Sequence, residues 1–466
     1  MPFLSIDFKS IPVLGLAIGW MEDNNLDYGL PVAFVIGILL YIAFTTSPFL
    51  MPSAFAFFLA LAPIWFPFMA LEIFHFRWLD YVQKKYYLSS RRKLYRIKLP
   101  QEVFKSPRAM EYVLSQAWST QTPDNFYESY VQGKAPLPTG LEIVSIGGEV
   151  RFYINIFEKK GAEALVPALY AHYPGIEVAE EPVDYTGEIE WQNDPEWEKW
   201  FTHINKKQSD DKWGPIRTYI EFGLDDNPKE EEKIDPLNTI LEQMAAMGPN
   251  ERLYVQYIIT AIAKPSLVRG NLKLFEGPNW TNFAERRVDE ILRRDPKTKG
   301  PIQSEGGTDF DGVPRVSPGE RDDCECIERN MEKYAYRVAI RFCYFAKKGH
   351  FRPNLINAFN RMFTQFDKVG RAALGQRWRT DFNYMWFSDP FGDRLRSHKQ
   401  VEHKLTKLRK FAPQAQSDDM KVFTTEELAT MFHIPGKVAT TPTLERIPSL
   451  RSQAPSNLPI GEPPTY

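Results

Sequence analysis

The sequence predicts an α+β protein in which an N-terminal two-helix transmembrane hairpin is followed by two ferredoxin-like (βαββαβ) units and an extended C-terminal tail. An uncharged apolar run between Asp27 and Glu72 predicts the hairpin. Alternating strand and helix patterns from residue 94 onward predict the two units. Prolines crowd the end of the chain and deny it regular structure. The 466 residues also exceed the roughly 250–300 residues of one compact core.

The apolar run is about twice as long as the ~20 residues that one membrane-spanning helix needs. Pro48 and Pro52 lie near its middle and interrupt helical hydrogen bonding there. We therefore expect one span near 30–47 and a second near 53–74, which together form a hairpin over residues 30–76.

Two other interpretations of the apolar run remain open. A cleaved signal peptide needs a basic start and an apolar stretch of roughly 7–15 residues, whereas the segment before Leu30 is acidic and the run is longer. A helical hairpin buried in a soluble core is the second alternative, which Pro63 and Pro67 favour slightly. Neighbouring groups can satisfy the carbonyls that proline frees in a span, so the membrane hairpin is our prediction.

Basic residues cluster directly after the second predicted span. The acidic Asp80 is outnumbered there by Arg77, Lys84, Lys85, Arg91, Arg92, Lys93, Arg96 and Lys98. Such an excess marks the cytoplasmic side of a bilayer. We expect a bacterial inner (cytoplasmic) membrane protein with two spans and both termini cytoplasmic, a short cytoplasmic segment at 1–29 and a basic juxtamembrane helix at 77–93. Arg91, Arg92 and Lys93 are then candidates for contact with lipid headgroups or nucleic acid.

The first ferredoxin-like unit is expected at residues 94–190. Period-two alternation predicts its strands, a serine–proline pair predicts a helix start, and a glycine pair predicts a two-residue hairpin turn. The expected elements are a strand at 94–99, a helix that begins at Ser106-Pro107, strands at 141–146 and 149–157 around Gly147-Gly148, a helix near 161–173 and a strand at 176–180.

The second unit is expected at residues 213–390 and contains an insertion at 266–333 between its middle strands. Its expected elements are a strand at 216–222, a helix opened by Asp235-Pro236, strands at 253–262 and 336–345, a helix at 353–366 and a strand at 383–387. In the insertion we expect a charged helix at 283–294, and then a mobile loop at 297–321 that is rich in Gly, Pro, Asp and Ser.

A basic helix is expected at 391–412, followed by a proline-rich tail at 413–466. Arg394, Arg396, Lys404 and Lys407 are candidates for contact with a nucleic-acid backbone, although a charged helix face explains them with fewer assumptions. In the tail, Thr424 and Glu427 form a capping box for a short helix at 426–432.

The sequence shows none of the residue patterns that catalysis or cofactor binding usually needs. It has no glycine-rich phosphate loop that ends in Gly-Lys-Ser/Thr. Cys324 and Cys326 have no further ligands at zinc spacing, so we interpret them as free thiols in a polar loop. The histidines are scattered, and the net charge of −2 gives no push toward nucleic acid. We predict no catalytic residue, cofactor or metal.

The tail carries a resemblance to a known family. The residues that carry it are Phe423–Gly436 (FTTEELATMFHIPG), Thr441–Ser449 (TPTLERIPS) and Ala454–Pro459 (APSNLP). They resemble the segment just before the ATPase core in bacterial membrane-anchored, type IV coupling-protein-like DNA-transfer ATPases. Leu141-Glu142-Ile143, Gly148, Phe152-Tyr153-Ile154, Tyr170–Pro174 and Asp184-Tyr185 are similar to the non-catalytic region before the same motor. The similarity covers roughly residues 95–460, and its specific part is the tail.

The resemblance implies a type IV secretion or conjugation context without ATPase activity, because in such relatives a phosphate-binding loop follows the Asn-Leu-Pro segment and here the chain stops at Tyr466. We expect a non-enzymatic, membrane-anchored docking platform for a separate P-loop ATPase, with a homo-oligomer also open. Seven tail residues are candidates for partner docking: Phe423, Leu428, Phe432, Pro435, Leu444, Ile447 and Leu458. The alternatives are an unrecognised enzyme with a site between the two units, or a membrane-tethered DNA-binding protein.

Overall fold

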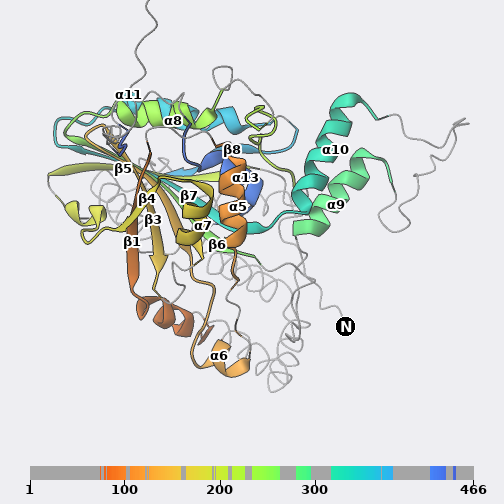
Figure 1. The fold of residues 1–466 in the computed structure, drawn as a ribbon, viewed down its shortest axis with the longest axis horizontal. Helices are drawn as coiled ribbons and strands as arrows, with labels where there is room; N and C mark the ends of the chain where they lie inside the picture. Colours follow the sequence, from red (N-terminus) through yellow and green to blue (C-terminus); the bar gives the residue numbers. More distant parts are fainter. Residues whose placement is uncertain are drawn as a thin grey trace, which may run out of the picture.

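One large antiparallel sheet organises the protein. The computed structural model describes residues 74, 78–79, 81–100, 105–120, 123, 125–158, 164–190, 194, 196–207, 213–225, 234–262, 280–294, 316–368, 370–380, 420–436 and 444–447. Within these residues, nine strands form the sheet in the order β4-β1-β3-β2-β6-β7-β5-β8, and β9 pairs with β7 (Figure 1). The strands are β1 (Arg92–Lys98), β2 (Thr139–Ile146), β3 (Glu149–Phe157), β4 (Glu177–Glu180), β5 (Trp197–Lys207), β6 (Glu251–Ala261), β7 (Ala335–Lys347), β8 (Ala373–Arg379) and β9 (Lys421–Thr424).

The sheet has two halves that are joined edge to edge. The first half has the order β4-β1-β3-β2 and the second has the order β6-β7-β5-β8. They meet where β2 pairs with β6 along all of Thr139–Ile146. The prediction of two separate ferredoxin-like units after a transmembrane hairpin is therefore wrong. Two separate units would leave the long edges of β2 and β6 unpaired, whereas their pairing satisfies the backbone groups of both strands.

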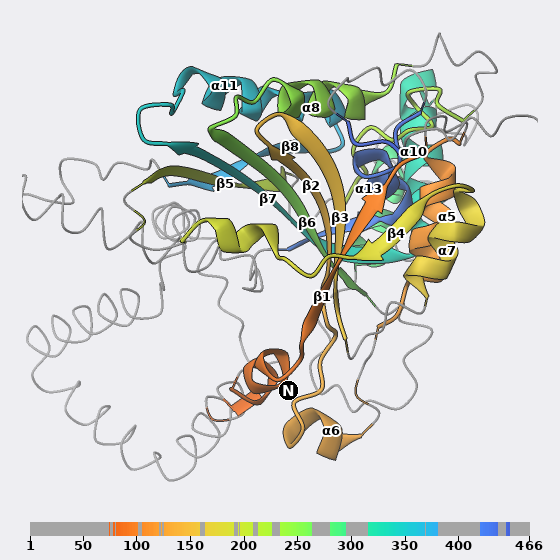
Figure 2. The same cartoon turned by 60° about the vertical axis from the view of Figure 1, so that its left-hand side comes forward.

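Helices cover one face of the sheet and enclose the main core. The helices on this face are α5 (Arg108–Gln116), α7 (Leu165–His172), α8 (Pro236–Ala245), α11 (Asn354–Arg361) and α13 (Thr425–Met431) (Figure 2). The opposite face carries a smaller core that includes Tyr185, Tyr254 and Phe345. Tyr185 comes from the short 3-10 helix η2 (Tyr185–Glu188), and a second 3-10 helix, η5, spans Thr364–Phe366. The short helix α6 spans Phe126–Tyr130.

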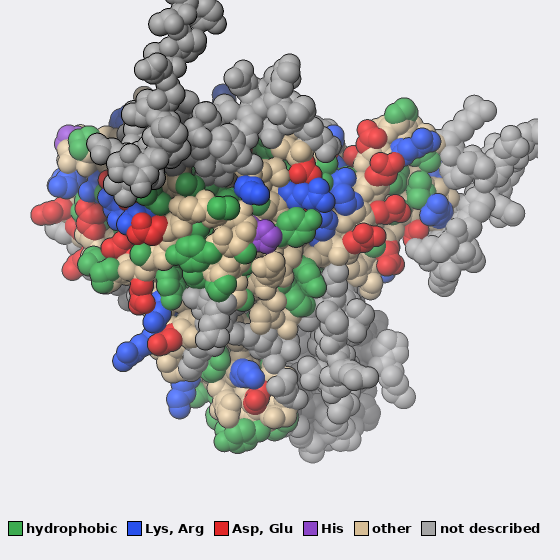
Figure 3. Space-filling model, in the orientation of Figure 1, with side chains coloured by type: hydrophobic (Ala, Val, Ile, Leu, Met, Phe, Trp, Pro, Cys, Tyr) green, Lys and Arg blue, Asp and Glu red, His purple; other side chains and the backbone are tan. Residues whose placement is uncertain are grey.

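Helices α9 (Trp280–Ile291) and α10 (Pro318–Met331) form an arm between β6 and β7. The arm projects from the side of the sheet in Figure 1, and Figure 3 shows acidic and basic side chains on it. Ser317 and Glu320 form a capping box at the start of α10, so a helix begins inside the predicted mobile loop. Cys324 and Cys326 are buried in α10, which corrects their prediction as thiols in a polar loop.

The predicted N-terminal hairpin lies, apart from Phe74, outside the described residues. No helix in the part of the chain that the structure describes is both long and apolar enough to cross a bilayer. On this finding, the prediction of a two-span inner-membrane protein with both termini cytoplasmic is corrected. Residues 81–88 are helical, but β1 begins at Arg92, inside the predicted helix at 77–93.

Local signals located some elements well and others poorly. The Gly147-Gly148 turn between β2 and β3 is confirmed, with φ of 63° and 92°, which glycine adopts without strain. The first strand of the second half is β5, whereas the predicted strand at 216–222 is irregular at 216–218 and a turn at 219–222. The predicted strand at 383–387 and the predicted basic helix at 391–412 lie outside the described residues.

Candidate functional site

The structure offers two buried polar places as candidates, one on each face of the sheet. The first, here called the tail groove, is where residues 420–436 and 444–447 lie against the rest of the protein. It begins where β9 pairs with Ala335–Val338 at the start of β7. Next along the chain, α13 packs against α5 and α8 and buries Leu428 and Phe432 completely.

The tail groove extends from the second half of the sheet to the first. At its far end, Leu444 forms a parallel bridge with Val150 of β3, and Arg446 forms one with Leu99 just after β1. The side chain of Glu445 makes a two-pronged ion pair with Arg96, with an Nη2 to Oε1 distance of 2.6 Å. The tail therefore connects the two halves of the sheet. Helix α13 lies on the helical face, whereas Arg96 points to the other face, like its cross-strand partner Tyr153.

A fully buried ion pair lies under α13. Lys206 Nζ of β5 donates to Glu427 Oε1 at 2.7 Å, and both side chains have 0% exposure. The same carboxylate oxygen accepts the backbone N–H of Ile216 at 2.8 Å. The Lys206 ammonium also lies over the rings of Trp213 and Phe423. Burial lowers the pKa of Lys206, and Glu427 opposes that change. The pair is held by charge, hydrogen bonds and rings together.

Further charged groups fix both ends of α13. Glu426 accepts two hydrogen bonds from the guanidinium of Arg329 on α10, at 3.0 and 3.1 Å. After the helix, His433 Nε2 lies 2.9 Å from Asp235 Oδ2, the N-cap residue of α8. Burial acts to lower the pKa of His433, but Asp235 and a backbone contact at Ala429 raise it above its usual value. These contacts hold both ends of α13 in place.

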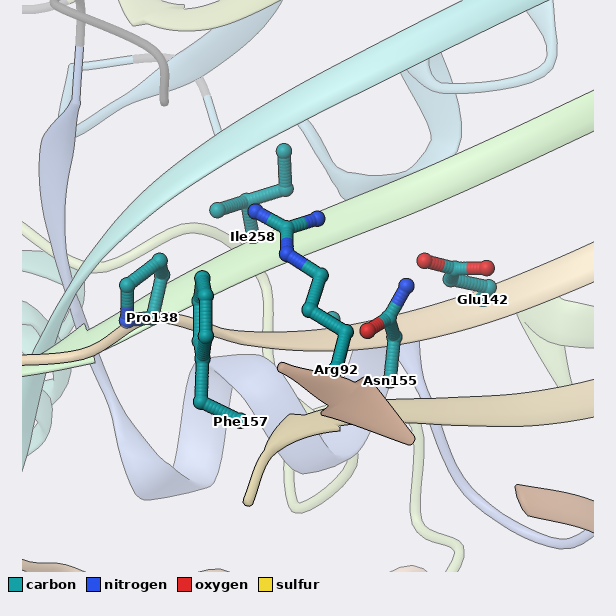
Figure 4. Close-up of a pocket in the computed structure, with 7 residues that line it drawn as sticks. Arg92, Pro138, Glu142, Asn155, Phe157 and Ile258 are labelled. Atoms are coloured by element: carbon teal, nitrogen blue, oxygen red, sulfur yellow. The ribbon is translucent and has the colours of Figure 1, made fainter. Parts of the chain in front are cut away.

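The second candidate is the Glu142 cavity on the opposite face (Figure 4). Its lining residues are Arg92, Pro138, Gly140, Glu142, Asn155, Phe157 and Ile258. Glu142 projects from β2 at the junction of the two halves, because β2 pairs with β6 there. The hydroxyl of Tyr185 donates to Glu142 Oε2 at 2.5 Å, and Gln256 Nε2 donates to the Tyr185 hydroxyl at 2.9 Å.

The environment of Glu142 makes its carboxyl titrate near neutrality. Its pKa is raised to about 7, mainly by burial and also by the carboxylate of Asp184, while Tyr185, Arg92 and Asn155 act to lower it. Burial and the nearby Glu142 also raise the pKa of Tyr185 well above its usual value. A carboxyl with a pKa near the working pH has the acid–base property that proton transfer needs.

The size of the cavity restricts what Glu142 can do. Its volume is about 10 Å³, which is room for roughly one water molecule. Small-molecule sites are typically about 300–1,000 Å³. General acid–base catalysis requires a reacting group within hydrogen-bond reach of the carboxyl. The cavity as it stands therefore accommodates a water rather than a substrate.

The predicted docking residues lie mostly inside the protein. Phe423, Leu428, Phe432, Pro435 and Leu444 are buried and Ile447 is half-buried, while Leu458 lies outside the described residues. The tail groove brings the buried residues together as part of the core. A partner that bound these side chains directly would have to displace them from it.

Only three of the seven residues predicted to contact lipid or nucleic acid lie within the described residues. Arg91 is exposed, Arg92 lies over the Phe157 ring beside the Glu142 cavity, and Lys93 pairs with Glu180 at 3.4 Å. The other four, Arg394, Arg396, Lys404 and Lys407, lie outside the described residues. In the part of the chain that the structure describes, no group of three or more His, Cys, Asp or Glu side chains is placed to hold a metal ion.

The sequence-based prediction missed Glu142, Tyr185 and Lys206. Glu142 had a usable signal, because it is the one charged residue in the apolar run Leu141–Val144 and had to be buried or to face a partner. Lys206 had no such signal, since it stands beside Lys207 at the end of a polar strand. Its partner Glu427 is more than two hundred residues away.

Comparison with protein families and with curated proteins gives no relative from which a role could be carried over. No protein-family model matches the chain, and no curated protein is detectably similar to it. The predicted link to type IV secretion, conjugation and DNA transfer has no support from these comparisons.

Proposed function

We propose that this protein is a non-enzymatic docking platform for a separate P-loop ATPase. One observation carries the proposal. Residues 423–436 carry the main part of the resemblance to the segment before an ATPase core. The buried Lys206–Glu427 pair and the packing of Phe432 fix these residues in the tail groove. A platform needs to hold such a segment rigidly, since a fixed attachment point sets the position of whatever binds beside it.

The described part of the tail ends at a defined point, residues 444–447, here called the exit point. Glu445 pairs with Arg96, and the backbone N–H of Ile447 donates to the carbonyl of Leu99 at 2.8 Å. Both contacts are with the first half of the sheet, on the end of β1 that is remote from Arg92. We expect the partner to contact the surface around this exit point.

The rival proposal, an enzyme with its site between the two halves, has the Glu142 cavity in its favour. That cavity lies at the junction of β2 and β6 and contains a carboxyl that titrates near neutrality. Its volume of about 10 Å³ supports the platform over the enzyme, because a substrate would have to open the sheet face to reach Glu142.

The test is affinity purification of the tagged full-length protein from its native host, followed by mass spectrometry of the proteins that accompany it. Three chains are compared: the wild type, Glu445→Lys and Glu445→Asp. Lysine at position 445 repels Arg96 and releases the exit point, whereas aspartate keeps the charge. We expect a P-loop ATPase with the wild type and with Glu445→Asp, and a several-fold lower recovery with Glu445→Lys.

Each alternative outcome has a separate meaning. Recovery of no ATPase with the wild type contradicts the docking platform. Equal recovery with all three chains contradicts the role of the exit point. Turnover of a small-molecule substrate by the purified wild type, lost in Glu142→Gln, would favour the enzyme instead.

A further inference from the structure

The tail segment, residues 420–447, has the contacts of a bound peptide in its described parts, 420–436 and 444–447. It meets the rest of the protein through backbone pairing at both ends, with β7 at one end and with Leu99 and Val150 at the other. Between these ends, α13 brings its own N-cap, because Thr424 and Glu427 form both bonds of a capping box. The helix therefore carries its start signal within the segment.

The groove is complementary to this particular sequence. Its donors include the Lys206 ammonium, which needs an acidic partner, and the backbone N–H of Tyr219, which donates to Thr430 Oγ1 at 2.9 Å. Its acceptors include Asn330 Oδ1, which receives the Thr424 hydroxyl at 2.5 Å. Buried polar groups of this kind are costly when unpaired, so they select a segment that satisfies all of them.

The apolar part of the groove adds shape to this chemistry. The ring of Phe432 meets Phe152 edge-on at 5.8 Å and Tyr257 at 6.1 Å between ring centroids. Both are core residues of the sheet, one from each half. A second copy of this chain presents the same segment and the same groove, and so offers every one of these contacts again.

A long stretch of chain joins β8 to the tail segment. Residues 381–419 separate the last described residue after β8 from the segment, and a fully extended chain of that length spans on the order of 100 Å. The segment of one copy can therefore reach the groove of another. Exchange of an identical element is a low-cost route to a dimer, since no new contact has to be made.

We propose that the tail groove accepts the 420–447 segment of a second copy of this chain as well as its own. The product is a dimer in which each copy completes the other's core through Lys206–Glu427 and β7–β9 pairing. The exchange depends only on contacts within the fold and does not require a separate ATPase to dock. Its fraction rises with the concentration of chains during folding, because closure within one chain is independent of concentration.

The experiment uses variants of the full-length chain that each add one cysteine to the three buried native ones. Arg337 of β7 and Val422 of β9 are cross-strand partners, and Arg337 is exposed. Such partners have Cβ atoms about 4.5–5.5 Å apart. Differently tagged Arg337→Cys and Val422→Cys chains are unfolded together, refolded at increasing concentration and treated with a short thiol cross-linker. We expect a covalent dimer that contains one chain of each kind and grows with concentration.

Two controls distinguish exchange of the tail segment from non-specific cross-linking. The wild type, whose described cysteines Cys324, Cys326 and Cys343 are buried, gives the background. The double variant Arg337→Cys/Val422→Cys on one chain shows cross-linking within a copy. Cross-linking in the double variant without any mixed dimer would overturn the proposal, as would an equal yield of dimer from either single variant alone.

A second pair at the other end of the segment gives an independent answer. Arg96 and Glu445 are ion-pair partners on β1 and on the tail, and both are partly exposed. Mixed Arg96→Cys and Glu445→Cys chains should give the same concentration-dependent dimer. A dimer with the first pair and none with the second would overturn exchange of the whole segment.

Discussion

The two faces of the sheet treat a buried carboxyl in opposite ways. On the helical face, Glu427 is paired with the buried ammonium of Lys206. On the other face, Glu142 has a neutral phenol as its closest donor, and burial raises its pKa to about 7. A carboxylate without water needs either an opposite charge or a proton. The tail groove uses the first solution and the Glu142 cavity uses the second, so the two should respond differently to mutation and to pH.

Removing one partner of the Lys206–Glu427 pair should have the largest effect. Lys206→Met leaves the Glu427 carboxylate buried without its ammonium, and breaking a buried pair in this way typically costs about 3–5 kcal/mol. The double variant Lys206→Met/Glu427→Gln removes both charges but keeps one acceptor oxygen, which can serve either the N–H of Ile216 or the Thr424 N–H of the helix cap. We therefore expect it to recover part of the loss in urea unfolding.

The single and double variants together test whether the Lys206–Glu427 pair holds α13 against the sheet. A loss below about 1 kcal/mol in Lys206→Met would mean that the ammonium contributes little and that packing of α13 suffices. A double variant as unstable as the single one would mean that the unpaired charge is not the main cost. The lost acceptor oxygen and the missing cation over the rings of Trp213 and Phe423 would then account for the loss.

The Glu142 carboxyl should instead make stability depend on pH. Its pKa in the folded protein, about 7, lies above the ordinary value of 4.5, so the folded state binds more protons than the unfolded state between these values. Stability from this group is therefore complete below about pH 4.5, falls as pH rises, and reaches its minimum above about pH 7. The shift corresponds to a loss on the order of 3 kcal/mol.

Glu142→Gln is the matched control, because glutamine stays neutral and its Oε1 can still accept from the Tyr185 hydroxyl. The difference in unfolding free energy between the wild type and this variant should change with pH between about 4.5 and 7 and be flat outside that window. A difference that does not change with pH would show that Glu142 stays charged, held by Arg92. Denaturant titrations at several pH values decide between these results.

Local rules predicted the features whose cause is local. The Gly147-Gly148 turn and the Thr424–Glu427 capping box depend on residues within a few positions of each other, and both are found. The β2–β6 junction depends on strands more than a hundred residues apart, and no short-range signal reports it. For this reason the sequence suggested two units where there is one sheet.

The tail was misjudged because the apolar side chains of its predicted helix at 426–432 were assigned to a partner. Leu428, Met431 and Phe432 instead have 0% exposure within this chain. Their spacing along one helical turn is the pattern of a buried helix face. The candidate site was harder still, since both the Lys206–Glu427 pair and the Glu142–Tyr185 contact join distant parts of the chain.

The smallest effect is expected at the exit of the tail. Arg96 and Glu445 are each about one-fifth exposed, and Arg96 also has Glu181 at 3.5 Å. Glu445→Gln should therefore cost about 1 kcal/mol or less in urea unfolding, as partly exposed ion pairs usually do. A loss of unfolding free energy as large as that of Lys206→Met would show that the Arg96–Glu445 pair contributes as much as the buried Lys206–Glu427 pair. A small loss, together with an unfolding midpoint of Glu445→Lys close to that of Glu445→Gln, would show that both variants stay folded. A fall in partner recovery with Glu445→Lys would then reflect a changed surface rather than an unfolded protein.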